Sequence, residues 1–94
     1  MKREWKIETG RVVRSKAGRD EGKYFVVMAL EGDEFALIAD GERRGVEKPK
    51  RKRVKHLFVT EETISSLQLR LTAGEAVENH EIRKWLAAYR QKEA

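Results

Sequence analysis

The sequence contains no cysteine, only one proline and no long apolar run. The lack of cysteine excludes disulfide bonds, thiolate metal ligands and a cysteine nucleophile. No segment approaches the roughly 20 consecutive apolar residues that span a bilayer, and the first ten residues lack the apolar run of a secretion signal. We therefore expect a cytoplasmic protein.

Recognisable catalytic motifs are lacking as well. A chain of 94 residues forms one small domain, whose core leaves little room for a deep substrate cavity. The serines have no neighbouring base, no phosphate-binding glycine loop lies between a strand and a helix, and His56 and His80 are too far apart to suggest a metal site. We expect a non-catalytic protein without a cofactor or metal.

Charged and apolar residues each make up 39% of the chain, and Lys and Arg exceed Asp and Glu by 21 to 16. Eight basic residues lie in the thirteen-residue segment 43–55: Arg43, Arg44, Lys48, Lys50, Arg51, Lys52, Arg53 and Lys55. Their mutual repulsion would be relieved by a polyanion, so nucleic acid is the favoured partner. A solvated loop that aids solubility is the alternative.

Apolar patterning predicts four strands, at residues 6–13, 23–30, 34–39 and 51–59. Gly32 and Asp33 fit a tight hairpin turn between the second and third strands. In the fourth strand we expect Val54 to face inward, and we expect the opposite face to carry basic side chains: Arg51, Arg53 and Lys55.

The spacing of apolar residues changes from that of a strand to that of a helix after Thr60. Thr60 can cap a helix that carries Ile64, Leu67 and Leu71 on one face. The same segment could also alternate as a strand. Asn79 can cap a second helix with one apolar stripe, formed by Ile82, Trp85, Leu86 and Tyr89. We therefore expect a mainly β protein with C-terminal α structure: a small antiparallel barrel in residues 1–60, then two short helices in residues 61–94, packed on or beside it.

A glycine-rich segment, ETGRVVRSKAGRDEGK in residues 8–23, resembles the KOW motif, with turn glycines at Gly10, Gly18 and Gly22. A second segment, RKRVKHL in residues 51–57, is similar to the strand and linker after the barrel in archaeal and eukaryotic large-subunit ribosomal KOW proteins. It departs from them at Phe58-Val59, where they often have an acidic residue and proline. The chain resembles small bacterial KOW-domain RNA-binding proteins over nearly its full length.

The resemblance implies an SH3-like barrel that binds RNA, with ribosomal RNA as the expected partner and a ribosome-associated role in translation. Together with the charge cluster, it gives these expected RNA-binding residues: Arg14, Lys16, Arg19, Lys23, Arg43, Arg44, Lys48, Lys50, Arg51, Lys52, Arg53, Lys55 and His56. The three motif glycines can equally be ordinary turn residues. One ring of the Tyr24-Phe25 pair is a candidate for stacking on RNA, whereas Trp85 and Tyr89 are expected in the core.

The alternative function is a protein-interaction module that docks on the transcription or translation machinery, because a basic loop also suits an acidic protein surface. Membrane attachment is disfavoured, because no aromatic or leucine side chain interleaves the basic loop. The RNA hypothesis requires the glycine turn and the cationic segment to lie on one side of the barrel. It also requires that the arginines are not paired with the protein's own glutamates.

Overall fold

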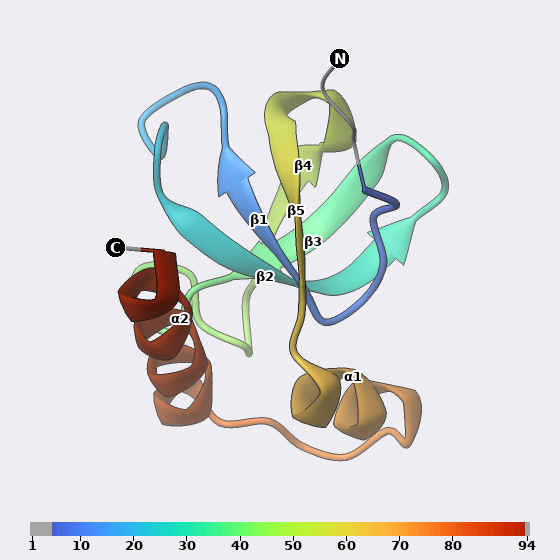
Figure 1. Ribbon diagram of the computed structural model, residues 1–94. Helices are drawn as coiled ribbons and strands as arrows, with labels where there is room; N and C mark the ends of the chain where they lie inside the picture. The colour runs from blue at the N-terminus through green and yellow to red at the C-terminus, as the bar shows by residue number, and fades with distance from the viewer. Residues whose placement is uncertain (1–4, 94) are drawn as a thin grey trace.

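The computed structural model describes residues 5–93. Five strands form one antiparallel sheet in the order β4-β3-β2-β1-β5, and two helices follow it (Figure 1). The elements are β1 (Arg11–Ser15), β2 (Tyr24–Glu31), β3 (Phe35–Ala39), β4 (Lys50–Arg53), β5 (Leu57–Thr63), α1 (Ser65–Thr72) and α2 (Asn79–Glu93). The expected mainly β architecture with C-terminal α structure is confirmed.

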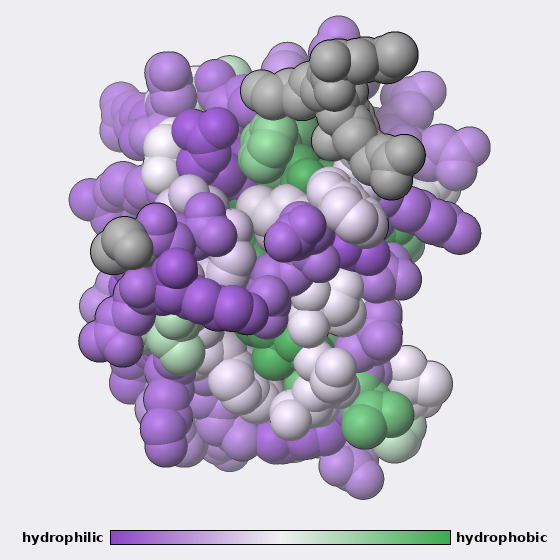
Figure 2. Space-filling model, viewed as in Figure 1, coloured by the Kyte–Doolittle hydropathy of each residue, from purple (hydrophilic) through white to green (hydrophobic). Residues whose placement is uncertain are grey.

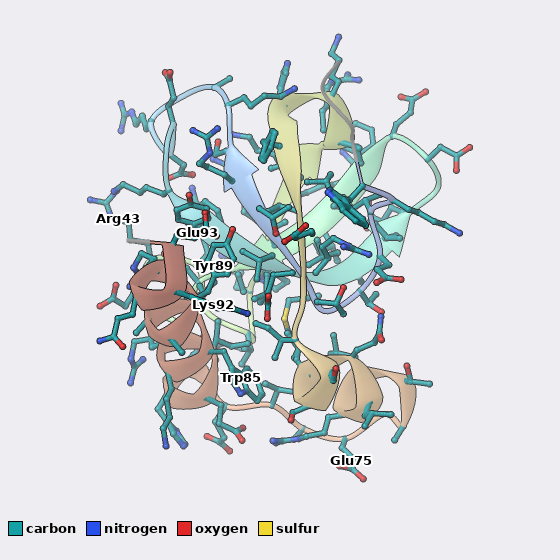
Figure 3. The ribbon with its side chains drawn as sticks, in the orientation of Figure 1. Arg43, Glu75, Trp85, Tyr89, Lys92 and Glu93 are labelled. Atoms are coloured by element: carbon teal, nitrogen blue, oxygen red, sulfur yellow. The ribbon has the colours of Figure 1, made fainter. Side chains whose placement is uncertain are left out.

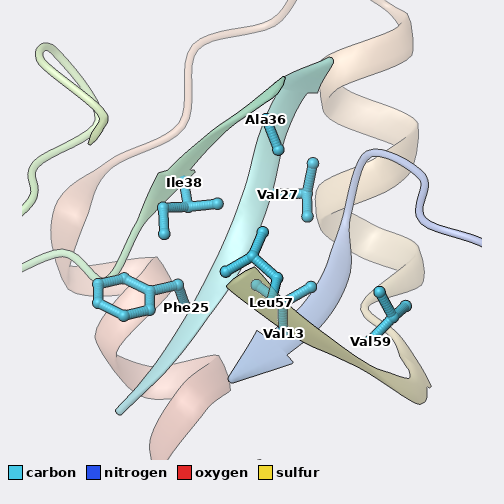
Figure 4. Close-up of a cluster of buried hydrophobic side chains, with 7 residues drawn as sticks. All are labelled: Val13, Phe25, Val27, Ala36, Ile38, Leu57 and Val59. Carbon is cyan, nitrogen blue, oxygen red and sulfur yellow. The ribbon is translucent and has the colours of Figure 1, made fainter. Parts of the chain in front are cut away.

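The sheet is buried on both faces along β1 and the first half of β2. One face carries the first core, drawn in Figure 4 and formed by Val13, Phe25, Val27, Ala36, Ile38, Leu57 and Val59. The opposite face meets the helices in the second core, formed by Val12, Val26, Leu67, Ile82, Leu86 and Tyr89. Neighbouring residues of β1 and β2 alternate between the two cores, which explains why β2 is a continuous apolar run in the sequence.

The strand predicted over residues 51–59 is wrong. The chain leaves β4 at Arg53, makes a short 3₁₀ helix over Val54–His56 and starts β5 at Leu57. The backbone N–H of Val54 donates to the carbonyl oxygen of Glu34 (2.8 Å), which fixes this turn beside the β2–β3 hairpin. Val54 is half-buried against the first core, as expected.

The first helix begins later than predicted. Thr60 lies in β5, where its hydroxyl donates to the carbonyl oxygen of Val12 (2.7 Å), and α1 begins at Ser65. Pairing of β5 with β1 therefore prevails over the helix-capping pattern. Asn79 is the first residue of α2, and its Oδ1 accepts a hydrogen bond from the N–H of Val46 (2.8 Å), so it ties α2 to the β3–β4 loop.

Hydrophilic residues cover most of the face shown in Figure 2, with hydrophobic residues in small separate areas. Across residues 5–93, no helix is long and apolar enough to cross a membrane. The same part of the chain holds no group of three or more His, Cys, Asp or Glu side chains arranged to bind a metal ion.

Candidate functional site

The glycine-rich loop between β1 and β2 lies against the cationic segment. The Nζ of Lys52 donates to the carbonyl oxygen of Ala17 (3.0 Å), and the Nζ of Lys50 donates to the carboxylate of Asp20 (3.2 Å). The backbone N–H of Lys16 donates to the carbonyl oxygen of His56 (2.8 Å). The glycine turn and strand β4 with its following turn therefore lie side by side.

These contacts engage two of the expected RNA-binding lysines, Lys52, which is buried, and Lys50, which is half-buried. Lys52 is only 9% exposed, and its burial, together with the nearby Lys50 ammonium, lowers its pKa. Lys50 is engaged by Asp20, which is 4% exposed. Burial alone would raise the pKa of Asp20, but the bond from Lys50 and the neighbouring cations hold it below the usual value of 3.8. Lys52 is therefore a weaker candidate for RNA contact than the exposed cations, because the fold uses this lysine to fix the loop.

Arg51 and Arg53 are paired with the protein's own glutamates. Arg51 Nε lies 2.6 Å from the carboxylate of Glu31, and Arg53 Nη1 lies 3.7 Å from that of Glu34. Both guanidinium groups also stack over the ring of Phe35, at 3.6 and 4.9 Å from its centroid. The condition that these arginines stay unpaired is therefore not met. The form of the RNA hypothesis that relied on Arg51 and Arg53 fails, and any RNA site must depend on other cations.

The remaining expected residues differ in exposure. Six are exposed and form no ion pair with the described residues: Lys16, Arg19, Lys23, Arg43, Lys48 and Lys55. Arg44 and His56 are half-buried, and Arg14 is half-buried with its guanidinium 5.3 Å from the centre of the Phe58 ring. The exposed lysines and arginines are the better candidates for contact with a partner.

A pocket of about 550 Å³ gathers two of these exposed cations with two more from α2. Lys23 comes from the end of the β1–β2 loop, Arg43 from the β3–β4 loop, and Arg83 and Arg90 from α2. Figure 3 shows Arg43 beside the last turns of α2. We call this site the cationic pocket. Three segments distant in the sequence thus bring four positive side chains to one place.

The loop that carries Arg43 is held against α2 by specific contacts. Arg83 Nη1 donates to the carbonyl oxygen of Gly41 (2.7 Å). A Cβ at Gly41, whose φ is +81°, would lie 2.5 Å from the carbonyl oxygen of Asn79, so only glycine permits this approach. Gly41 thus lets the loop backbone approach α2 closely, and this approach brings Arg43, two residues further along, close to the helix.

Two acidic residues, Asp40 and Glu42, also line the cationic pocket. The Oδ1 of Asp40 accepts hydrogen bonds from the N–H groups of Glu42 and Arg44, both at 2.9 Å, so this carboxylate serves to shape the loop. Glu42 is exposed. With four basic and two acidic side chains, the pocket keeps an excess of positive charge, which favours an anionic ligand.

Arg83 and Arg90 were missed from the sequence because the charge of the C-terminal segment is nearly balanced. A signal was present, since residues 83, 87 and 90 follow the i, i+4, i+7 spacing of one helix face. Only the packing of α2 on the sheet shows that this face points at Lys23 and Arg43.

No model of a known protein family matches the chain, and no curated protein is similar to it.

Proposed function

We propose that the protein is a non-catalytic RNA-binding module of the KOW type, and that it acts on ribosomal RNA in the cytoplasm as a ribosome-associated protein. The strand order β4-β3-β2-β1-β5 and the 3₁₀ turn before β5 support the SH3-like barrel that this family resemblance implies. Positive φ angles at Gly10, Gly18 and Gly22 (86°, 79° and 86°) support the glycine turn of the motif.

The cationic pocket is the observation that carries the proposal. Four basic side chains converge there from the β1–β2 loop, the β3–β4 loop and α2. Their convergence costs repulsion that a phosphate group would relieve, and guanidinium groups suit phosphate because they can donate two parallel hydrogen bonds. An RNA backbone is the natural ligand for such a pocket when further cations surround it.

Further exposed cations lie on the two loops that supply Lys23 and Arg43. Lys16 and Arg19 are exposed on the β1–β2 loop, and Lys48 is exposed on the β3–β4 loop. Lys55, on the 3₁₀ turn, is exposed beside Asp33 and Glu34. A small anion would need only the pocket, whereas an extended polyanion can contact these side chains as well. The binding we propose is therefore electrostatic and shape-dependent, with phosphates as the main contact.

Charge variants on the two flanks of α2 test this proposal. Arg90 lines the cationic pocket, whereas Lys92, two residues on, forms an ion pair with Glu62 (3.1 Å) away from it. We expect Arg43→Gln and Arg90→Gln each to weaken binding to a fluorescein-labelled fragment of ribosomal RNA by about 5-fold, the factor given by ~1 kcal/mol per charge contact. Fluorescence anisotropy at constant salt measures the affinities.

Lys92→Gln is the matched control, since it removes the same charge from the same helix and should leave the affinity within about 2-fold. Equal losses in the pocket variants and the control would contradict a localised site. RNA binding untouched by Arg43→Gln and Arg90→Gln would also contradict it, because the RNA would then bind elsewhere on the protein. Failure of the wild-type protein to bind RNA would favour the alternative in which the protein docks on another protein of the transcription or translation machinery.

A further inference from the structure

A second pocket, of about 380 Å³, lies next to the cationic pocket and is lined by aromatic rings. The four rings belong to Trp5, Tyr24, Phe58 and Tyr89. Tyr24 lines both pockets, and both use the last turns of α2, through Arg90 in the cationic pocket and Tyr89 in this one. We call it the aromatic pocket. A ligand bound through phosphates in the first pocket would reach the second across Tyr24.

The inner wall of the aromatic pocket is buried and packed, and its rim is exposed. The rings of Tyr24 and Tyr89 pack edge to face, with centroids 5.3 Å apart, and Tyr89 is only 8% exposed. Figure 3 shows Tyr89 pointing from α2 toward the sheet. Trp5 is 40% exposed, so it presents an indole face at the rim. A fixed wall and an exposed indole make a surface on which a flat ring can stack.

The charges around the aromatic pocket narrow the choice of ligand. Arg14 stacks over Phe58 and Arg11 lies 5.9 Å from the centre of the Trp5 ring, so positive charge of the protein lies beside these rings and would repel a cationic ligand. Glu61 and Glu93 also line the pocket, and their carboxylates would repel a phosphate. A neutral flat ring with N–H donors for these carboxylates fits best, and a nucleobase is such a ring.

We propose that the aromatic pocket binds an unpaired base of the RNA whose backbone phosphates lie in the cationic pocket; this inference rests on the proposed function. A base inside a duplex is stacked and paired, so it cannot enter. The protein should therefore prefer RNA with unpaired nucleotides over a perfect duplex. The cationic pocket alone would give no such preference, because RNA with unpaired nucleotides and a perfect duplex both carry backbone phosphates.

A tryptophan reporter tests the inference directly. In the Trp85→Phe background, Trp5 is the only tryptophan, and its fluorescence should be quenched by an RNA hairpin with an unpaired loop but not by a perfect duplex of the same length. Trp5→Ala should weaken hairpin binding by about 5- to 150-fold, the range that corresponds to loss of one stacked base, with duplex binding unchanged. Trp5→Phe keeps an aromatic face and should retain most of the hairpin affinity.

The outcomes separate this inference from the proposed function. If Trp5→Ala weakens hairpin and duplex equally or leaves both unchanged, or if the hairpin binds without quenching Trp5, the base pocket is overturned while phosphate binding stands. If Trp5 responds to a trimethyl-lysine peptide and not to RNA, the pocket recognises a protein cation instead. If neither RNA binds in a salt-dependent way, the proposed function itself fails. Thermal melting of each variant checks that it is folded.

Discussion

At the scale of single residues, two motif glycines have different structural roles. Gly10 has a φ of +86°, and a Cβ built there would lie 2.8 Å from the Cβ of Gln68 in α1. Gln68 also donates through Nε2 to the carbonyl oxygen of Thr9 (2.9 Å). Gly22 has the same φ, but nothing lies within 4 Å of the position of its missing Cβ. Gly10 therefore serves both the turn and helix docking, whereas Gly22 serves the turn alone.

Alanine substitutions should separate these roles. Gly22→Ala should lower the free energy of unfolding by about 1–2 kcal/mol, the cost of a Cβ in the left-handed region. Gly10→Ala should cost more, about 2–4 kcal/mol, because overpacking against Gln68 is added. Urea denaturation followed by circular dichroism measures both. Equal losses would show that α1 does not pack on Gly10 in solution.

At the scale of elements, one ion pair joins the two helices. Arg70 of α1 donates from Nη1 and Nη2 to the two carboxylate oxygens of Glu81 in α2, at 2.5 and 2.9 Å. Glu81 also accepts a hydrogen bond from the backbone N–H of Glu78 (3.0 Å). The bonds from Arg70 and then the Glu78 N–H lower the pKa of Glu81 from 4.5 to about 2.

This pKa predicts a pH-dependent stability. A carboxylate with a lowered pKa in the folded state contributes stability that is present above its usual pKa of 4.5 and is lost as the pH falls toward 2. Glu81→Gln should therefore be less stable than the wild type at pH 7, and the difference in melting temperature should shrink between pH 4.5 and 2. A difference that stays constant over this range would contradict the ion pair.

Glu75→Gln is the control for this comparison. Glu75 lies 4.0 Å from Arg70 Nε and is exposed, so its removal should have a smaller effect at every pH.

The elements also show what sequence patterns can and cannot predict. The β2–β3 hairpin was predictable, because an apolar run, the turn glycine Gly32 and a second apolar run are all local signals. The break at Val54–His56 was not, because it depends on a hydrogen bond to Glu34 in a distant part of the chain. Thr60 followed by two glutamates is a typical helix start, yet pairing of Val59 with Val13 extends the strand.

At the scale of the whole molecule, the two cores decide where the charges lie. The second core docks α2 on β1 and β2, and this docking brings Arg83 and Arg90 to Lys23 and Arg43. The sequence predicted a concentration of cations, but not which of them the fold would bury or pair with its own carboxylates. Lys52 illustrates the difference, because a strand made entirely of basic residues must turn every second side chain inward.

The salt dependence of RNA affinity tests the central claim most directly. If the cations of the pocket and its surrounding loops neutralise about five to eight phosphates, the logarithm of the association constant should fall with the logarithm of salt concentration with a slope of about −3 to −6. Titrations of the wild-type protein with a ribosomal RNA fragment at several salt concentrations give this slope. A slope in that range supports phosphate binding, and a slope near zero would contradict it.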